Sequence, residues 1–284
     1  VLQVLSNSVD GDDGSLSTII DAMAEHTEIP ATNKSELCKA EKNFLARKLY
    51  ASWLVHIFTT TGVLCALYGI VDIFNDRPAR ALIWLVIAQI IDGLDGPMAR
   101  SVDVKKFVPV IDGNVLDLVI DYMTCVVVPV LFILHFAMFP RGFELIMTSL
   151  IMISSVLWFS RKDIETNDMW FRGFPAGWNM VVTALWLCDF GHLVNMITSI
   201  VFIILTMTPS VKFFHILGSL QLRKTTISIT SIMIIVMVLM IFLDGEHHNG
   251  YGKLVIVAWL AYYFATSIWR SLQGDELTDI HVHS

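Results

Sequence analysis

Apolar residues dominate the chain from about residue 51 onward, in runs of 16 to 26 residues separated by short polar stretches. Helices of this length and composition can cross the ~30 Å hydrocarbon core of a bilayer. The pattern predicts eight spans, near residues 52–74, 80–99, 113–138, 142–160, 174–189, 191–208, 225–243 and 253–270. The shortest division is an Asp-Phe-Gly turn between Cys188 and His192. The expected fold class is an all-α membrane protein, a polytopic helical bundle of about eight transmembrane helices.

The same pattern divides the chain into four parts. Residues 1–33 are acidic and rich in Ser, Asp, Thr and Gly, which predicts a disordered cytosolic tail. In residues 34–50, apolar side chains such as Leu37, Phe44 and Leu49 recur at helical spacing among basic ones, which predicts an amphipathic helix at the membrane interface. Residues 51–271 form the predicted transmembrane domain with the candidate chemistry, and 272–284 form a short polar C-terminal tail.

Composition and charge agree with a membrane protein. Hydrophobic residues make up 55% of the chain and charged residues 16%, against about 25% charged in ordinary soluble domains. The net charge of -7 arises mostly in the first 33 residues, which hold six acids and no Lys or Arg, so no basic surface for nucleic acid is expected. In the predicted topology, fifteen Lys and Arg share the N-terminal side and four lie on the other. The positive-inside rule therefore places the N-terminus in the cytosol.

Four aspartates interrupt the second and third predicted spans near their cytosolic ends: Asp92, Asp95, Asp117 and Asp121. A charged side chain inside a membrane costs roughly 3 kcal/mol and calls for a partner. The first two are three residues apart and the last two are four apart, so each pair shares one helix face, and we expect the pairs to converge. Carboxylate oxygens suit Mg²⁺, Mn²⁺ or Ca²⁺. Two such ions would balance four negative charges.

Two alternative roles for these aspartates stay open from the residues alone. One is a structural ion network with Arg100, Lys105 and Lys106. It is disfavoured because three basic residues of one loop cannot all reach helix faces two turns deep. The second is a cation pathway, which would make the protein a divalent-cation transporter or channel. It is disfavoured because the remaining predicted spans carry almost no acids away from their ends.

The aspartates also belong to a longer motif. Asp92, Asp95, Gly96, Ala99 and Arg100, followed by Gly113, Asp117 and Asp121, resemble the signature DxxDGxxAR...GxxxDxxxD of the CDP-alcohol phosphatidyltransferases. Within that family the chain is most similar to the bacterial branch whose acceptor is choline, in the segments DGLDG, LDxxxDYxT and GFPAGWN. The resemblance covers roughly residues 45–270. The chain departs from the pattern in the twelve residues between Arg100 and Gly113, in Cys125 and in Gly177.

This resemblance implies the CDP-alcohol phosphatidyltransferase fold and transfer of the phosphatidyl group from CDP-diacylglycerol to choline, with release of CMP. It implies two divalent cations, Mn²⁺ or Mg²⁺, held by Asp92, Asp95, Asp117 and Asp121, with Asp121 also taking the proton of the attacking hydroxyl. The residues implied to bind CDP-diacylglycerol are Gly96, Ala99, Arg100 and Gly113. A homodimer in the bacterial cytoplasmic (inner) membrane, with its active site facing the cytosol, is also implied.

The acceptor site is predicted from chemistry. Choline carries a permanent positive charge, which aromatic faces and a nearby anion can hold. The predicted choline-binding residues are Tyr122, Asp168, Trp170, Phe171, Phe174, Trp178 and Asn179. An interfacial aromatic belt would account for the same Trp and Phe residues equally well. Serine or glycerol phosphate stays open as acceptor, although an anionic acceptor would want further basic residues.

Overall fold

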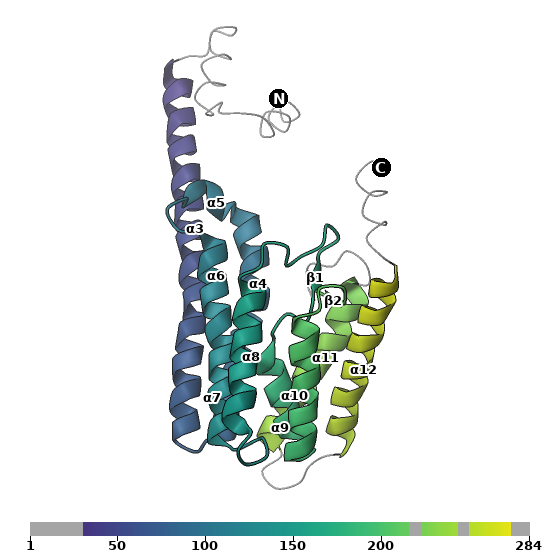
Figure 1. Ribbon diagram of the computed structural model, residues 1–284. Coiled ribbons are helices and arrows are strands. Elements are labelled where there is room, and N and C mark those ends of the chain that lie inside the picture. The colour runs from purple at the N-terminus through teal and green to yellow at the C-terminus, as the bar shows by residue number, and fades with distance from the viewer. Residues whose placement is uncertain (1–30, 216–222, 244–249, 274–284) are drawn as a thin grey trace.

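The computed structural model describes residues 31–215, 223–243 and 250–273. It is a bundle of upright helices with a small two-stranded sheet toward one end (Figure 1). The helices are α3 (Ala31–Phe74), α4 (Pro78–Val102), α5 (Val104–Phe107), α6 (Gly113–Asp121), α7 (Val128–His135), α8 (Glu144–Phe159), α9 (Trp178–Cys188), α10 (His192–Thr206), α11 (Arg223–Leu243) and α12 (Gly250–Leu272), with the π-helix η1 (Tyr122–Val127) between α6 and α7. Strands β1 (Trp170–Arg172) and β2 (Lys212–Phe214) pair antiparallel, with Trp170 opposite Phe214.

Five stretches of helix are long and apolar enough to cross a membrane: Asn43–Phe74, Pro78–Val102, Gly113–His135, Lys224–Phe242 and Gly250–Leu272. Three further apolar helices, α8, α9 and α10, are shorter. The prediction of an all-α, multi-pass membrane protein is confirmed, whereas the count of eight crossings stays a prediction. Helix α3 begins and α12 ends toward the end of the bundle at which β1 and β2 lie, called the sheet end below (Figure 1). An even number of crossings requires this arrangement.

Helix α3 runs without a break for 44 residues. The sequence predicted an interfacial helix over 34–50 that leads into the membrane. In the structure one helix continues from this segment into the first span, because no Gly or Pro interrupts it before Gly62, and its place at the interface stays a prediction. Its first turns extend beyond the other helices at the sheet end (Figure 1). The predicted tails, 1–33 and 272–284, lie outside the described residues except for a few positions at the ends of α3 and α12.

The turn between α9 and α10 is as short as predicted. Helix α9 ends at Cys188 and α10 begins at His192. Between them, Asp189 has a φ of 47° and Gly191 a φ of 87°. Glycine adopts this left-handed conformation without the steric cost that other residues meet. The Asp-Phe-Gly sequence therefore divides one long apolar stretch into two helices.

A change of helix type follows directly after Asp121. Residues Tyr122–Val127 form a π-helix, and α7 then resumes the α-helical form. Pro129, the second residue of α7, lacks the N–H that would bond the carbonyl of Cys125, and its ring crowds that carbonyl. A wider turn relieves this conflict. The π-helix thus places one irregular turn beside the aspartates of α6.

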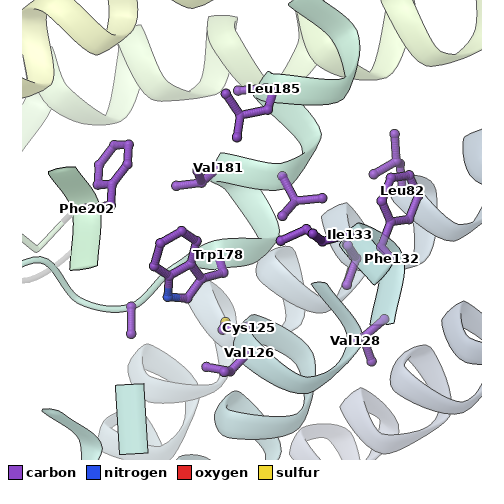
Figure 2. Packing of buried hydrophobic residues seen from close by; sticks show 14 of the residues in the cluster. Leu82, Cys125, Val126, Val128, Phe132, Ile133, Trp178, Val181, Leu185 and Phe202 are labelled. Carbon is purple, nitrogen blue, oxygen red and sulfur yellow. The ribbon is translucent and has the colours of Figure 1, made fainter. Parts of the chain in front are cut away.

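Helices α7, α9 and α10 and the π-helix contribute to a continuous apolar core that runs through the bundle. Figure 2 shows Trp178 of α9 between Phe202 of α10 and the η1 residues Cys125 and Val126. Trp178 and Val126 are each 0% exposed. This rigid packing holds α9 against the helix that carries Asp117 and Asp121.

Candidate active site

Helices α4 and α6 bring the four aspartates to one small pocket. Asp92, Asp117 and Asp121 each direct a carboxylate oxygen to a common point, and these oxygens lie within 4.8 Å of one another. Asp95 lines the same pocket and is buried. The predicted convergence of the two pairs is confirmed. The pocket lies in the half of the bundle nearer the sheet end, since α6 begins there (Figure 1).

The start of α6 is fixed by its own sequence. The carboxylate of Asp112 accepts hydrogen bonds from the backbone N–H groups of Asn114 and Val115, at 3.0 and 3.4 Å. Such N-caps stabilise a helix start by about 1 kcal/mol. Because the cap fixes where the helix begins, it also fixes the face on which Asp117 and Asp121 lie.

Helix α3 supplies a wall of the pocket that sequence reasoning missed. Thr59 and Gly62, three residues apart on one face, line the pocket together with Ile120 of α6. A Cβ atom on Gly62 would lie 2.7 Å from Cγ2 of Ile120, so α3 and α6 approach closely here. The small residues at this spacing were the available signal.

No ion pair joins the four aspartates to a basic side chain among the described residues. The two lysines of α5, Lys105 and Lys106, are exposed. Arg100 is also exposed. Its guanidinium lies over Gly96: a Cβ atom added at Gly96 would be 3.4 Å from Nη1 of Arg100. The structural ion network with these three residues is therefore not formed in the described part of the chain.

One aspartate is held by neutral side chains instead. Gln89, one turn before Asp92 on α4, donates a hydrogen bond from Nε2 to Oδ2 of Asp92 at 2.9 Å. Asn179 in the first turn of α9 donates from Nδ2 to Oε1 of Gln89 at 2.8 Å. Sequence reasoning placed Asn179 in a choline pocket; here both ends of its amide are engaged, since its Oδ1 accepts the N–H of Met180 at 2.9 Å.

The residues predicted to bind CDP-diacylglycerol lie on α4 and α6 near the aspartates but do not line the pocket. Gly96 and Arg100 are neighbours on α4, with Ala99 between them in sequence and half-buried. Gly113, the first residue of α6, faces α3, where a Cβ would lie 3.5 Å from Cε1 of His56. Their role in binding stays a prediction.

The charge of Arg100 extends to the small sheet. Burial raises the pKa of Glu165, and Arg100 opposes this rise. Burial, together with the charge of Arg100, lowers the pKa of His215. His215 in turn packs against the ring of Phe171 at 4.9 Å between centroids. Arg100, in the last turn of α4, therefore acts electrostatically on groups beside β1 and β2.

The aromatic residues predicted to bind choline are largely core residues. The exposed fractions are 0% for Trp178, 1% for Trp170 and 4% for Phe174. Trp178 donates from Nε1 to Oγ of Ser155 at 3.0 Å. None of the seven predicted residues lines the carboxylate pocket. Tyr122 and Phe171 are half-buried, and their contribution to acceptor binding stays a prediction.

Asp168 does not offer a bare anion either. Its carboxylate oxygens accept two hydrogen bonds from Arg270, at 2.8 and 3.0 Å, and one from Thr166 at 2.7 Å. Burial raises the pKa of Asp168, but the hydrogen bonds from Arg270 and Thr166 outweigh burial and hold that pKa below its usual range. Asp168 is therefore paired with Arg270 in this structure, and its part in choline binding stays a prediction.

The fold and this pocket define a multi-pass membrane protein with a buried carboxylate cluster. Curated proteins named phosphatidylcholine synthase resemble the chain over most of its length. The one from Pseudomonas aeruginosa is 35% identical over 223 residues, which are 78% of this chain and 92% of the relative. The one from Borreliella burgdorferi is 37% identical over 222 residues, 78% and 94% of the two chains. No family model matches the chain.

The chain belongs to the phosphatidylcholine synthase family. It is therefore an enzyme of the transferase class in phospholipid biosynthesis, as the sequence predicted. The carboxylate pocket is its candidate active site, because it gathers the four motif aspartates of α4 and α6.

Proposed function

We propose that this protein is a CDP-alcohol phosphatidyltransferase that transfers the phosphatidyl group of CDP-diacylglycerol to choline and releases CMP. The observation that carries the proposal is the cluster of Asp92, Asp95, Asp117 and Asp121 in one pocket, without a basic ion-pair partner among the described residues. The names of the relatives agree with phosphatidylcholine as the product.

The donor set fits two divalent cations. Three carboxylate oxygens within 4.8 Å of one another, with a fourth carboxylate in the same pocket, match the all-oxygen ligation of Mn²⁺ or Mg²⁺. Asp92, Asp95, Asp117 and Asp121 would hold the ions. When bound, such ions neutralise phosphate charge and make the phosphorus more electrophilic. A diphosphate could not otherwise approach four carboxylates.

The chain's own residues account for the remaining steps. The choline hydroxyl oxygen forms a bond to the phosphatidyl phosphorus, and the bond from that phosphorus to the bridging oxygen of CDP breaks, so CMP leaves. Asp121, at the end of α6, accepts the hydroxyl proton. Gly96 and Ala99 let the nucleotide approach α4 closely, and Arg100 meets the phosphate charge. Tyr122, next to Asp121 in sequence and half-buried, is the proposed aromatic contact of the cationic head group.

The topology belongs to the same proposal. The excess of Lys and Arg on one side supports a cytosolic sheet end and eight crossings in the bacterial inner membrane. The carboxylate pocket then opens toward the compartment that holds choline. A homodimer is also proposed, on the resemblance of the motif alone.

An acceptor screen tests the proposal. The purified protein in lipid nanodiscs is given CDP-diacylglycerol and Mn²⁺ with choline, serine or glycerol 3-phosphate, and CMP and lipid products are measured. We expect CMP release and phosphatidylcholine with choline alone. If serine or glycerol 3-phosphate alone is incorporated, the acceptor is wrong. Mn²⁺ uptake into sealed vesicles that hold the protein is measured in parallel. If Mn²⁺ enters these vesicles and no acceptor yields CMP, the protein is a cation transporter and the enzyme proposal fails.

A further inference from the structure

Two amide side chains outside the predicted metal-ligand set form a continuous link to it. Asn179 of α9 bonds Gln89 of α4, and Gln89 bonds Asp92, at 2.8 and 2.9 Å. Asn179 and Gln89 are ninety residues apart in sequence. The link therefore joins a helix with no acidic ligand to the carboxylate cluster.

The direction of every hydrogen bond in this link is fixed from one end. Oδ1 of Asn179 accepts the backbone N–H of Met180 at 2.9 Å, so Nδ2 of Asn179 must face Gln89. A donor facing Gln89 requires Oε1 there, which turns Nε2 toward Asp92. Reversing either amide would set two donors or two acceptors against each other. The backbone of α9 thereby fixes the orientation of both amides, so that Gln89 presents a donor to Asp92.

The link is held by rigid surroundings. Asn179 is 1% exposed, and its backbone carbonyl accepts a hydrogen bond from Oγ1 of Thr183 at 2.7 Å. Its neighbour Trp178 is fully buried in the core between Phe202 and η1 (Figure 2). Because its neighbours already hold it in place, the buried amide of Asn179 loses little conformational entropy when it hydrogen-bonds and orients Gln89. Gln89 shares a helix face with Asp92, three residues away, so it reaches the carboxylate without strain.

We propose that Gln89 and Asn179 are positioning residues that hold the carboxylate of Asp92 in the orientation that metal binding needs. This inference rests on the proposed function, because it assigns Asp92 to a divalent-cation site. Groups that hydrogen-bond a metal ligand fix its rotation, and their loss weakens metal binding by about 10- to 100-fold. Neither amide is among the residues that line the carboxylate pocket.

The test measures Mn²⁺ affinity by calorimetry on the full-length protein in nanodiscs, without substrate. Gln89→Met keeps the length of the side chain and removes the donor, so we expect an affinity loss of about 10- to 100-fold. Asn179→Leu leaves Gln89 free to turn, so the expected loss is smaller. Because both residues act through one link, the double variant should lose no more than Gln89→Met alone. The KM for choline should stay within about twofold of the wild type, since neither amide lines the pocket.

Asn195→Leu is the matched control. Asn195 is also a buried Asn, on α10, and donates from Nδ2 to the carbonyl of Met138 at 3.1 Å. We expect it to lower thermal stability while leaving Mn²⁺ affinity unchanged. Wild-type affinity in both link variants, additive losses in the double variant, or an equal loss in Asn195→Leu would overturn the inference. A wild-type protein that binds Mn²⁺ but makes no phosphatidylcholine would count against the proposed function alone.

Discussion

The contact between Gly62 of α3 and Ile120 of α6 makes a sharp prediction about the pocket. A Cβ at position 62 would lie 2.7 Å from Cγ2 of Ile120, about 0.7 Å short of the 3.4 Å at which ordinary contact begins. Ile120 precedes Asp121, and its β-branched side chain has little freedom to turn in a helix. In Gly62→Ala, α6 must therefore move away from α3 and carry Asp117 and Asp121 with it.

The expected magnitude follows from this displacement. Overpacking of this kind costs about 1–3 kcal/mol of stability. A shift of about 1 Å in reacting groups can lower a rate by roughly 100-fold. We therefore expect Gly62→Ala to fold, to unfold at a somewhat lower temperature and to lose about 10- to 100-fold in CMP release.

Two further variants make the reasoning refutable. Ile120→Leu removes the Cγ2 methyl and keeps the volume, so it should restore most of the activity when combined with Gly62→Ala. Gly69→Ala is the control, because its Cβ would lie 3.3 Å from Cγ1 of Val128 and needs only a slight adjustment. CMP release and thermal unfolding are measured for each. Wild-type turnover in Gly62→Ala, or a loss that Ile120→Leu does not relieve, refutes the steric account.

Three other predictions concern single side chains. Asp121→Asn cannot accept the hydroxyl proton, so turnover should fall by about 10²- to 10⁴-fold while CDP-diacylglycerol binding, measured by calorimetry, persists. Asp103→Asn, at an exposed site, is the control, and retained turnover in Asp121→Asn would show that Asp121 is not the general base. Asp168→Asn removes the carboxylate that the fully buried Arg270 binds, so the free energy of unfolding, measured by thermal unfolding, should fall by about 3–5 kcal/mol. The double variant Asp168→Asn with Arg270→Leu should regain most of this stability. Because the pKa of Asp168 is lowered, this stabilisation is complete at neutral pH and is lost only as the pH falls below about 4; a loss already near pH 7 would contradict it. Trp178→Ala should lower the free energy of unfolding by about 3–5 kcal/mol and leave the KM for choline unchanged. Trp53→Ala, at a 44% exposed site, is the control and should change neither quantity. A raised KM with intact stability would indicate that Trp178 belongs to the acceptor pocket.

Periodicity predicted the carboxylate cluster because each pair of aspartates lies on a single helix. Residues three or four apart share a face whatever the rest of the fold does, so Asp92 with Asp95 and Asp117 with Asp121 needed no tertiary information. The break before His192 was also predictable locally, from the glycine of the turn, whereas hydropathy placed the start of the last span at 253 and α12 begins at Gly250.

The contacts between distant helices could not be predicted in this way. Asn179 carries no mark in the sequence that separates an amide bound to Gln89 from one facing a ligand. Asp168 pairs with Arg270, 102 residues later, and no spacing announces it. In the sequence, Trp178 is equally compatible with a choline-binding cage, an interfacial aromatic belt or the buried core. Its packing against Phe202 in the structure shows that it is a core residue. The π-helix after Asp121 was not predicted, because Pro129 alone is compatible with a kink, a helix break or a wider turn.

The central claim is that the four carboxylates hold divalent ions against the diphosphate of a lipid-linked nucleotide. The most direct test is an experimental structure in lipid with Mn²⁺ and CDP-diacylglycerol, with anomalous scattering recorded at the manganese edge. The account predicts anomalous density in contact with Asp92, Asp95, Asp117 and Asp121 and with the diphosphate. Anomalous density elsewhere, or carboxylates bound to Lys and Arg in its place, would contradict it.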